Sequence, residues 1–587
     1  MKCVKFLLAI FSITFLFSIN KTYVLDLDFQ GNHNVPDDKL AELLRLQKKT
    51  FIATTEFKTN KLNLDLLSIQ SFYKSKGYLD VEVDYAYDYA DESNINIQFF
   101  INEGYRYQIR KISIIGNKYF KDSFILDMLE LESEFYNPSY IRKQLLSLKN
   151  EYMKIGKINI SIKDEVVKDG NLIDLNIYIS EGNKFYIDRI TISGLDRIDQ
   201  KLVMRELIFH VGDLYNIESI DISKSHLFES QLFSSVEMFP YVSSDTTVAL
   251  DIRIREIRNR EIEFEFGFSQ LPSNQGDLPV SAINALANYD RSNLFNSATK
   301  LSFKTEYGIS YSDDSRFLRS YYELGLYSPW FIKVRIPFRF KIYNESILFK
   351  SLVLGDRKTG IITYIENYRS SNPYLSAGLI TEFFESNKNQ NRSIYASYMK
   401  HNIKNFINPS DGYYISINPR LNGTFLGGTY NYFKSDFELK LFKTIFDYFV
   451  FATRAKTGFI HLLNTSNGPS ISQVPDFDKF FLGGASSLRG WTSPVDYNSE
   501  VGGLFRTLLN FEIRFPVYKI LGLEFFYDGG VITPDLNNNF SGIKEEFNWN
   551  VGWGIVIQSN LGPARIDFAF KRGVGERTVQ VSLLNMF

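Results

Sequence analysis

An arginine and an aspartate are the residues whose types and positions most clearly suggest chemistry. Arg489 lies in the segment FLGGASSLRGW, and the later segment LGLEFFYDGG, if it forms a strand, places Phe526 and Asp528 on the face opposite most of its apolar residues. A guanidinium held away from bulk water needs a carboxylate for a forked, charge-assisted bond, and an aromatic ring can stack on it. The strand pattern therefore offers a carboxylate and a ring that could receive a guanidinium, whereas an Arg-Gly pair taken alone is usually a solvated turn.

Patterns typical of catalysis or metal binding are missing from the sequence. The segment from Gly484 to Leu488 lacks the second glycine of a nucleophile elbow, and no segment resembles a phosphate-binding loop. A net charge of -1 gives no electrostatic footprint for nucleic acid. We therefore expect no enzyme, no cofactor and no metal, and we read the five histidines as ordinary surface or core residues: His33, His210, His226, His401 and His461.

The start of the chain is typical of a secretory signal. Lys2 and Lys5 precede an apolar run over residues 6–19, which predicts a signal peptide at 1–20, with a transmembrane anchor as the alternative. The single cysteine, Cys3, would be removed with this signal. Aromatic residues make up 16% of the chain, yet the mean hydropathy is only -0.16. That combination favours membrane strands that alternate apolar and polar residues over membrane helices.

Three repeats follow the signal. A strand that ends in glycine occurs at Gly31, Gly116 and Gly194, and helical patterns follow each one. The phrases FINEGYRYQI and YISEGNKFYI close the first two copies. In the third copy LFESQLFSSVEMFP replaces a Gly-Tyr phrase, which makes that copy the least regular. Each repeat is predicted to run β-α-α-β-β, within residues 21–105, 106–183 and 184–257.

From Arg258 the pattern changes to strands alone. Apolar residues alternate with charged ones, which suits a barrel with lipid outside and water inside better than a soluble all-β domain, the alternative. We count about 16 strands over residues 258–587, or 17 if residues 347–367 form two. An even count predicts one closed barrel with both ends of the domain on the same side.

The repeats resemble polypeptide-transport-associated (POTRA) domains, and LRGW resembles the Val-Arg-Gly-Phe/Tyr loop motif of the BamA-like outer-membrane assembly superfamily, the surface-antigen barrels. Leucine replaces the valine and Trp491 the aromatic residue. With three repeats, the chain looks most like TamA-type members, the barrel subunits of the translocation and assembly module. The resemblance implies that the loop arginine is received by an aromatic residue and an aspartate on the barrel wall. The implied lock comprises Arg489, Gly490, Trp491, Phe526 and Asp528.

The resemblance also implies a function. We expect a protein of the outer membrane, with its repeats in the periplasm, that inserts unfolded barrel or secreted client proteins by β-augmentation at repeat edges and at the barrel seam. An accessory subunit in the periplasm or inner membrane is a further expected partner. The alternatives are a two-partner-type secretion pore and a passive porin or adhesin. The expected seam residues are Glu261, Phe264, Phe268, Val579, Val581 and Phe587.

Overall fold

The computed structural model describes most of the chain after the predicted signal. The described residues are 22–49, 55–130, 134–271, 280–311, 316–349, 356–368, 372–385, 387–445, 449–463, 470–492, 496–497, 502–518, 520–534, 547–558, 563–573 and 577–583. The predicted signal peptide and Phe587 lie outside them. The chain divides into two compact units, of which the first contains the first two repeats and the second contains all of the strand region. The third repeat contributes segments to both units.

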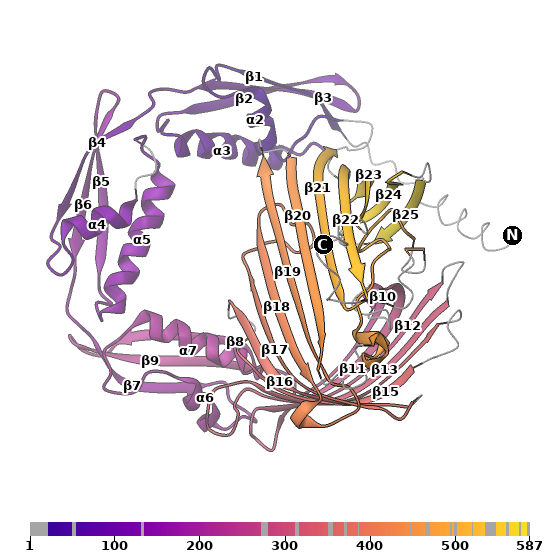
Figure 1. Cartoon of the computed structure of the whole chain (residues 1–587). Coiled ribbons are helices and arrows are strands. Elements are labelled where there is room, and N and C mark those ends of the chain that lie inside the picture. The colour runs from indigo at the N-terminus through magenta and orange to yellow at the C-terminus, as the bar shows by residue number, and fades with distance from the viewer. Residues whose placement is uncertain are drawn as a thin grey trace. The chain divides into compact units, whose positions relative to one another are not determined.

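All three repeats have the predicted order of elements (Figure 1). In each sheet the last strand is central, and in the first two it pairs parallel with the first strand and antiparallel with the second. The first repeat comprises β1 (Tyr23–Gln30), α2 (Asp37–Leu43), α3 (Thr59–Ser75), β2 (Glu82–Asp91) and β3 (Asn94–Asn102). The second comprises β4 (Gln108–Ile115), α4 (Asp122–Leu129), α5 (Pro138–Lys154), β5 (Ser161–Asp169) and β6 (Leu172–Ser180). The third comprises β7 (Tyr186–Ser193), α6 (Gln200–Glu206), α7 (Ile217–Glu229), β8 (Phe233–Val242) and β9 (Thr247–Glu256).

Helix α5 shows how the sequence specifies these elements. Asn137 caps it, because its side chain accepts hydrogen bonds from the backbone N–H groups of Ser139 and Tyr140, and Pro138 starts the first turn. One face then carries apolar residues at helical spacing against the sheet, and the last of them, Tyr152, is fully buried. This packing forms the core of the second repeat.

In each repeat a glycine follows the first strand, and a glutamate at the end of the central strand holds the turn after that glycine by hydrogen bonds. The three glycines have φ of +87°, +93° and +88°, and a Cβ on any of them would lie 2.0–2.3 Å from a carbonyl oxygen of the central strand. The glutamate that follows accepts hydrogen bonds from backbone N–H groups of the turn. The glycine and glutamate pairs are Gly31 with Glu103, Gly116 with Glu181, and Gly194 with Glu256.

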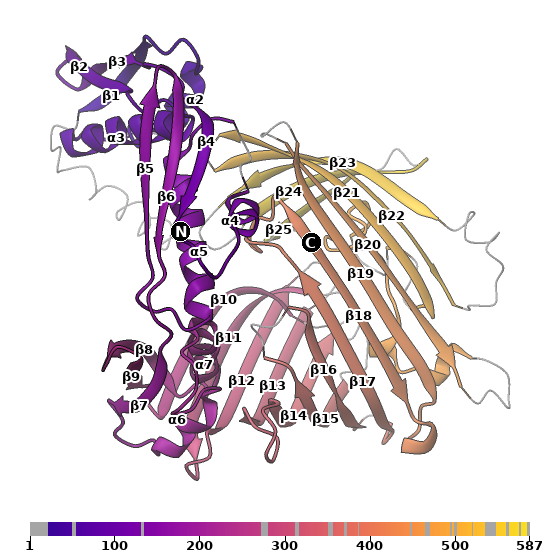
Figure 2. The ribbon, with the colours of Figure 1, turned by 90° about the vertical axis from the view of Figure 1, so that its left-hand side faces the viewer.

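The strand region forms one sheet of sixteen strands, each antiparallel to the next in chain order (Figures 1 and 2). The strand count therefore agrees with the prediction. The strands are β10 (Arg260–Leu271), β11 (Val280–Leu294), β12 (Thr299–Tyr311), β13 (Arg316–Ser328), β14 (Phe338–Phe349), β15 (Asp356–Glu366), β16 (Tyr374–Phe384), β17 (Gln390–His401), β18 (Gly412–Asn422), β19 (Tyr432–Ile445), β20 (Phe449–Leu462), β21 (Phe505–Tyr518), β22 (Leu521–Thr533), β23 (Asn548–Ile557), β24 (Ala564–Lys571) and β25 (Arg577–Leu583).

The prediction of a closed barrel is wrong for this structure. Strands β10 and β25 are the two ends of the sheet, and among the described residues each pairs with one neighbour only. Closure requires hydrogen bonds between the first and last strands, and the alternation that predicts strands contains no information about that pairing. The structure therefore has a seam between β10 and β25.

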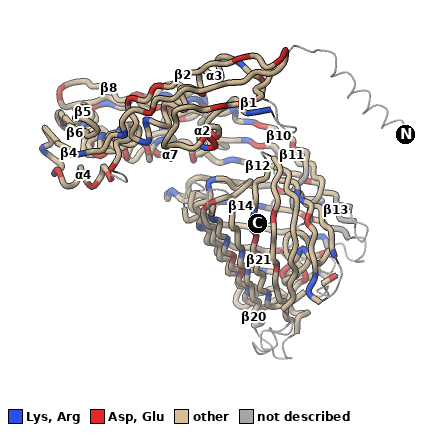
Figure 3. Tube along the Cα trace, turned by 90° about the horizontal axis from the view of Figure 1, so that it is seen from above, with Lys and Arg blue, Asp and Glu red and all other residues tan. Residues whose placement is uncertain are grey.

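The two faces of the sheet differ in polarity as the alternation predicts. Phe264 and Phe266 of β10 are 79% and 82% exposed on the outer face. The inner face buries charged residues, as where Arg319 lies 3.3 Å from Glu306 and 2.7 Å from Glu345. Figure 3 shows charged positions recurring along the strands. In the part of the chain that the structure describes, no helix is long and apolar enough to cross a membrane.

The hydrogen bonds from the turn at Lys118 and Tyr119 to Glu181 should make the stability of the second repeat depend on pH. Burial tends to raise the pKa of the Glu181 carboxyl, but backbone N–H groups of Lys118 and Tyr119 and the Lys157 ammonium outweigh it and hold the pKa at about 2. Because this pKa is lower than in the unfolded chain, the stabilisation is complete above about pH 4.5 and is lost as the pH falls toward 2.

We therefore expect Glu181→Gln to destabilise the second repeat by about 2 to 3 kcal/mol at pH 7, because hydrogen bonds to a buried charge are lost. The difference from the unchanged protein should shrink between pH 4.5 and 2. Hydrogen exchange at the Lys118 and Tyr119 amides measures it. The control is Glu165→Gln on the exposed face of β5. Equal protection of both amides in the two variants at pH 7 would contradict this role for Glu181.

Candidate functional site

The candidate site lies in the long connection between β20 and β21, residues 463–504, which contains the LRGW motif. The connection contains two short 3-10 turns, Ile471–Gln473 and Asp476–Asp478, before it reaches the Leu488 to Trp491 segment. Leu488 is fully buried and packs with Leu482 and Leu508. The loop is therefore anchored by apolar packing immediately before the arginine.

Arg489 is fully buried and contacts three carboxylates. Its Nε and Nη2 donate to the two oxygens of Asp528 at 2.9 and 2.8 Å, which forms the predicted fork. Nη1 lies 3.0 Å from Glu524 and 2.9 Å from Glu512. The guanidinium carbon stands 3.5 Å from the centre of the Phe526 ring. The structure thus brings Arg489 to Asp528 and Phe526, as the resemblance implied, and these two lie on the inner face as the strand pattern predicted.

Uncharged side chains hold the loop backbone around this arginine. The Gly490 N–H donates to Asn550 Oδ1 at 3.0 Å, and a Cβ at residue 490 would lie 2.8 Å from the Asn550 side chain. Thr578 donates to the Gly490 carbonyl at 2.7 Å. Gln580 Nε2 donates to the carbonyls of Arg489 and Trp491, both at 2.8 Å. Two residues of the terminal strand β25 therefore fasten the loop motif from inside the sheet.

Trp491 lies at the edge of the site. Its ring packs edge-on against Tyr497 with centroids 5.1 Å apart, and Lys571 Nζ lies 5.5 Å above it. The aromatic residue thus contacts the loop and β24, whereas Phe526 of β22 is the ring that stacks on the arginine.

Sequence reasoning missed most of the polar residues of the site. The alternation that placed Asp528 inward also placed Glu524 inward, so a signal for that carboxylate was present. Glu512 belongs to the preceding strand and stands opposite Phe526, and Asn510 stands opposite Asp528. This register between β21 and β22 has no marker in either strand alone. The missed residues are Asn510, Glu512, Glu524, Asn550, Thr578 and Gln580.

The predicted seam residues lie on the two end strands where these are described. Phe264 on β10 is exposed, as are Val579 and Val581 on β25, at 53% and 76%. Glu261 pairs with Asp290 in the β10–β11 ladder, and Phe268 pairs with Ile283. The structure gives no ladder between these two sets of residues among those described, and Phe587 lies outside the description.

Comparisons with known proteins agree with this arrangement. A model described as the surface antigen variable number repeat matches residues 22–104, 107–182 and 185–257, and a model of the Omp85 superfamily domain matches residues 362–583. The chain is 24% identical to the outer membrane protein assembly factor BamA of Neorickettsia risticii, over 96% of this chain and 78% of that protein. It is 22% identical to the BamA of Nitratidesulfovibrio vulgaris, over 94% of this chain and 71% of that one.

A solved structure shares the fold. BamA from Haemophilus ducreyi, lacking POTRA domains 1–3, superposes with a TM-score of 0.56 at 15% identity, covering 81% of this chain and 98% of that structure. At this identity the likeness concerns the fold alone.

Because three carboxylates surround Arg489, removing the arginine and removing Asp528 should lower the stability by different amounts. Arg489→Ala removes the cation that the three buried carboxylates share and leaves Glu512 with Arg514 and Glu524 with Arg565, which should cost about 3 to 5 kcal/mol. Asp528→Ala should cost less, because Glu512 and Glu524 still receive the guanidinium. Arg489→Lys should restore only part of the stability, since lysine keeps the charge but cannot form the fork.

The measurement is the temperature at which the protein loses its folded, heat-modifiable mobility on a gel. The matched control is Arg392→Ala on β17, an exposed arginine whose loss should cost about 0 to 1 kcal/mol. Equal loss in the two alanine variants at 489 and 528, or fully additive loss in the double variant, would contradict a shared buried cluster.

Proposed function

The chain belongs to the Omp85 superfamily of POTRA-plus-barrel proteins, and from this we propose that it assembles β-barrel proteins into the outer membrane. The observation that carries the proposal is the seam, where two end strands with exposed apolar side chains face the membrane without a shared ladder among the described residues. An unpaired strand edge is a template for another strand. A client strand that pairs with β10 or β25 would satisfy its backbone before it meets lipid, which cannot hydrogen-bond to it.

The repeats are proposed to hold the client before it reaches the seam. Strands β2 and β5 lie at the outer side of their sheets and pair only with the central strand among the described residues. Their free backbone groups suit an extended polypeptide, which needs hydrogen-bond partners but no particular side chains. This mechanism breaks and forms no covalent bond, so it needs neither a catalytic residue nor a cofactor.

The arginine cluster is proposed to act as a structural lock. Its buried charges fix the loop inside the sheet, and through Thr578 and Gln580 the loop fixes β25. A client-binding arginine would need to be accessible, whereas Arg489 is fully buried. The burial of Arg489 therefore favours a role in controlling the seam, through β25, over direct contact with the client.

The narrower assignments remain predictions. The TamA-type likeness rests on the number of repeats, and an accessory subunit is proposed from the resemblance to the superfamily. The named relatives are assembly factors, which favours assembly over a secretion pore or a passive porin.

Depletion of the protein, followed by a proteomic inventory of the outer membrane, tests the proposed function. Assembly predicts a broad loss of barrel proteins. Loss of a single secreted protein with barrels intact would support the secretion pore instead, and an unchanged inventory would support the porin.

Edge binding by the first repeat can be tested with proline. Successive residues of an edge strand direct their N–H groups alternately toward the neighbouring strand and away from it. We expect proline at one of the adjacent positions Ala86 and Tyr87 in β2 to weaken peptide binding at least fivefold without unfolding the repeat, because proline removes one backbone donor. The probe is a synthetic peptide with the sequence of residues 577–587, measured by fluorescence anisotropy. Asp88→Ala on the same strand is the control, and equal binding by both proline variants and the control would contradict edge pairing.

The hold of the loop on β25 can be tested at Gln580. Gln580→Leu leaves the buried Arg489 carbonyl without its donor, whereas the Trp491 carbonyl keeps the Gly484 N–H, and this should cost about 1 to 3 kcal/mol and speed amide exchange in β25. Val579→Leu, on the outer face of the same strand, should leave exchange unchanged. If exchange in β25 is the same in both variants, the loop does not hold the strand.

A further inference from the structure

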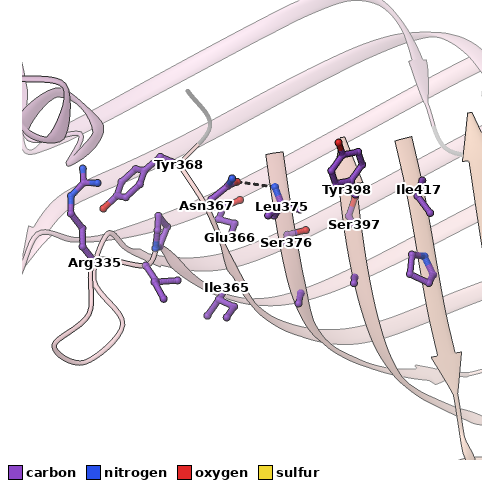
Figure 4. A pocket seen from close by; sticks show the side chains of 15 residues that line it. Arg335, Ile365, Glu366, Asn367, Tyr368, Leu375, Ser376, Ser397, Tyr398 and Ile417 are labelled. Atoms are coloured by element: carbon purple, nitrogen blue, oxygen red, sulfur yellow. Dashed lines mark hydrogen bonds between the residues drawn. The ribbon is translucent and has the colours of Figure 1, made fainter. Parts of the chain in front are cut away.

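A groove crosses the outer wall of the sheet at β15 to β18, on the face that meets the membrane (Figure 4). It has a volume of about 740 Å³, within the range of small-molecule sites, and an adjoining hollow of about 550 Å³ shares its floor. The shared floor residues are Ala377, Ala396 and Pro419. The seam and the Arg489 cluster involve other strands, so the groove is a separate feature.

The strand register explains the shape of the groove. Ala377 of β16 stands opposite Ala396 of β17, and Pro419 of β18 stands opposite Ser435 of β19, so small side chains continue across neighbouring strands. Large apolar residues border this floor on both sides. One ridge is Leu379, Ile394 and Leu421, the other is Leu375, Tyr398 and Ile417, and Ile365 stands opposite Ala377 and closes the end on β15. The floor runs across three strand spacings, from β16 to β19, and at about 4.8 Å for each spacing it is about 14 Å long.

Pro419 also interrupts the wall beneath the groove. The β17–β18 ladder pairs Tyr395 with Arg420 and resumes only at Tyr398 with Ile417. Proline has no N–H to donate, and in an interior strand it removes a ladder hydrogen bond. On the inner face a side-chain hydrogen bond from Ser397 to Asn418, at 2.6 Å, crosses the gap. Beneath the floor, β17 and β18 therefore lack backbone ladder pairs, but the side-chain hydrogen bond on the inner face still joins them.

The border of the groove near the strand ends is polar but electrically balanced. Arg335 is paired with Glu206 at 3.0 Å and with Glu229 at 2.8 Å, and its guanidinium lies 3.8 Å from the Tyr368 ring. Figure 4 shows the Tyr398 hydroxyl pointing away from the floor, toward the end of its strand. No hydrogen-bond partner for this hydroxyl occurs among the described residues. A phenol in this position suits the interface between hydrocarbon and headgroups.

We propose that this groove binds one acyl chain of a zwitterionic phospholipid from the periplasmic leaflet, with the headgroup at Tyr398. An acyl chain suits the apolar floor because it needs no hydrogen bonds. A client polypeptide would have to leave its backbone unpaired there, since β16 is already paired on both sides. The cation at the border is already matched by two carboxylates, so an anionic headgroup gains no attraction over a zwitterionic one.

The test is native mass spectrometry of the full chain, released into mild detergent from bilayers of equal parts phosphatidylethanolamine and phosphatidylglycerol. The unchanged protein should retain one phosphatidylethanolamine. Ala377→Leu with Ala396→Leu fills the floor and should lower the retained fraction at least fivefold. Ala455→Leu is the matched control, an outward alanine on β20 between Leu439 and Leu509, and should retain lipid normally. Heat-modifiable mobility establishes that each variant is folded.

Three results would overturn the proposal. Equal retention in the filled-floor variant and the unchanged protein would show that the groove is not the site. Preferential retention of phosphatidylglycerol would contradict the balanced border. A photoreactive amino acid that replaces Leu375 could be crosslinked in cells. If it captured polypeptide and not phospholipid, the groove would be a client-binding surface.

Discussion

A buried guanidinium has to be matched by negative charge, and this requirement organises one end of the sheet. Taking Arg489 out of water is tolerable only because Asp528, Glu524 and Glu512 receive it, while Phe526 covers one face of its plane. The carboxylates come from two neighbouring strands, so β21 and β22 must keep a single register to present them together. Any slip by one residue would turn those carboxylates toward lipid.

The period of two along a strand made part of this cluster predictable. It placed Phe526 and Asp528 on the inner face without knowledge of any other strand. It could not connect Glu512 to them, because that contact depends on the register between strands, and it could not show that Thr578 and Gln580 meet a loop about 90 residues earlier in the chain. Closure failed as a prediction for a related reason, since it depends on two strands at opposite ends of the domain.

The repeats show the same division between local and distant information. Their glycines recur at the end of the first strand of each copy and mark a turn that only glycine accommodates, so the sequence revealed all three copies. The role of Glu103, Glu181 and Glu256 was not visible, because each fastens a turn that lies 60 to 70 residues earlier. The third copy lacks the glycine after its glutamate yet keeps the turn, which shows that the carboxylate is the part of the Glu-Gly phrase that the turn needs.

The hydrogen bonds from β25 to the loop also link the seam to the connection between β20 and β21. The loop leaves the sheet after β20, the eleventh strand in order, and so on the side opposite the one where β10 begins. A displacement of β25 at the seam must break its hydrogen bonds to the carbonyls of Arg489, Gly490 and Trp491, or move these residues with it. The position of β25 at the seam and the position of the Arg489 segment are therefore set together.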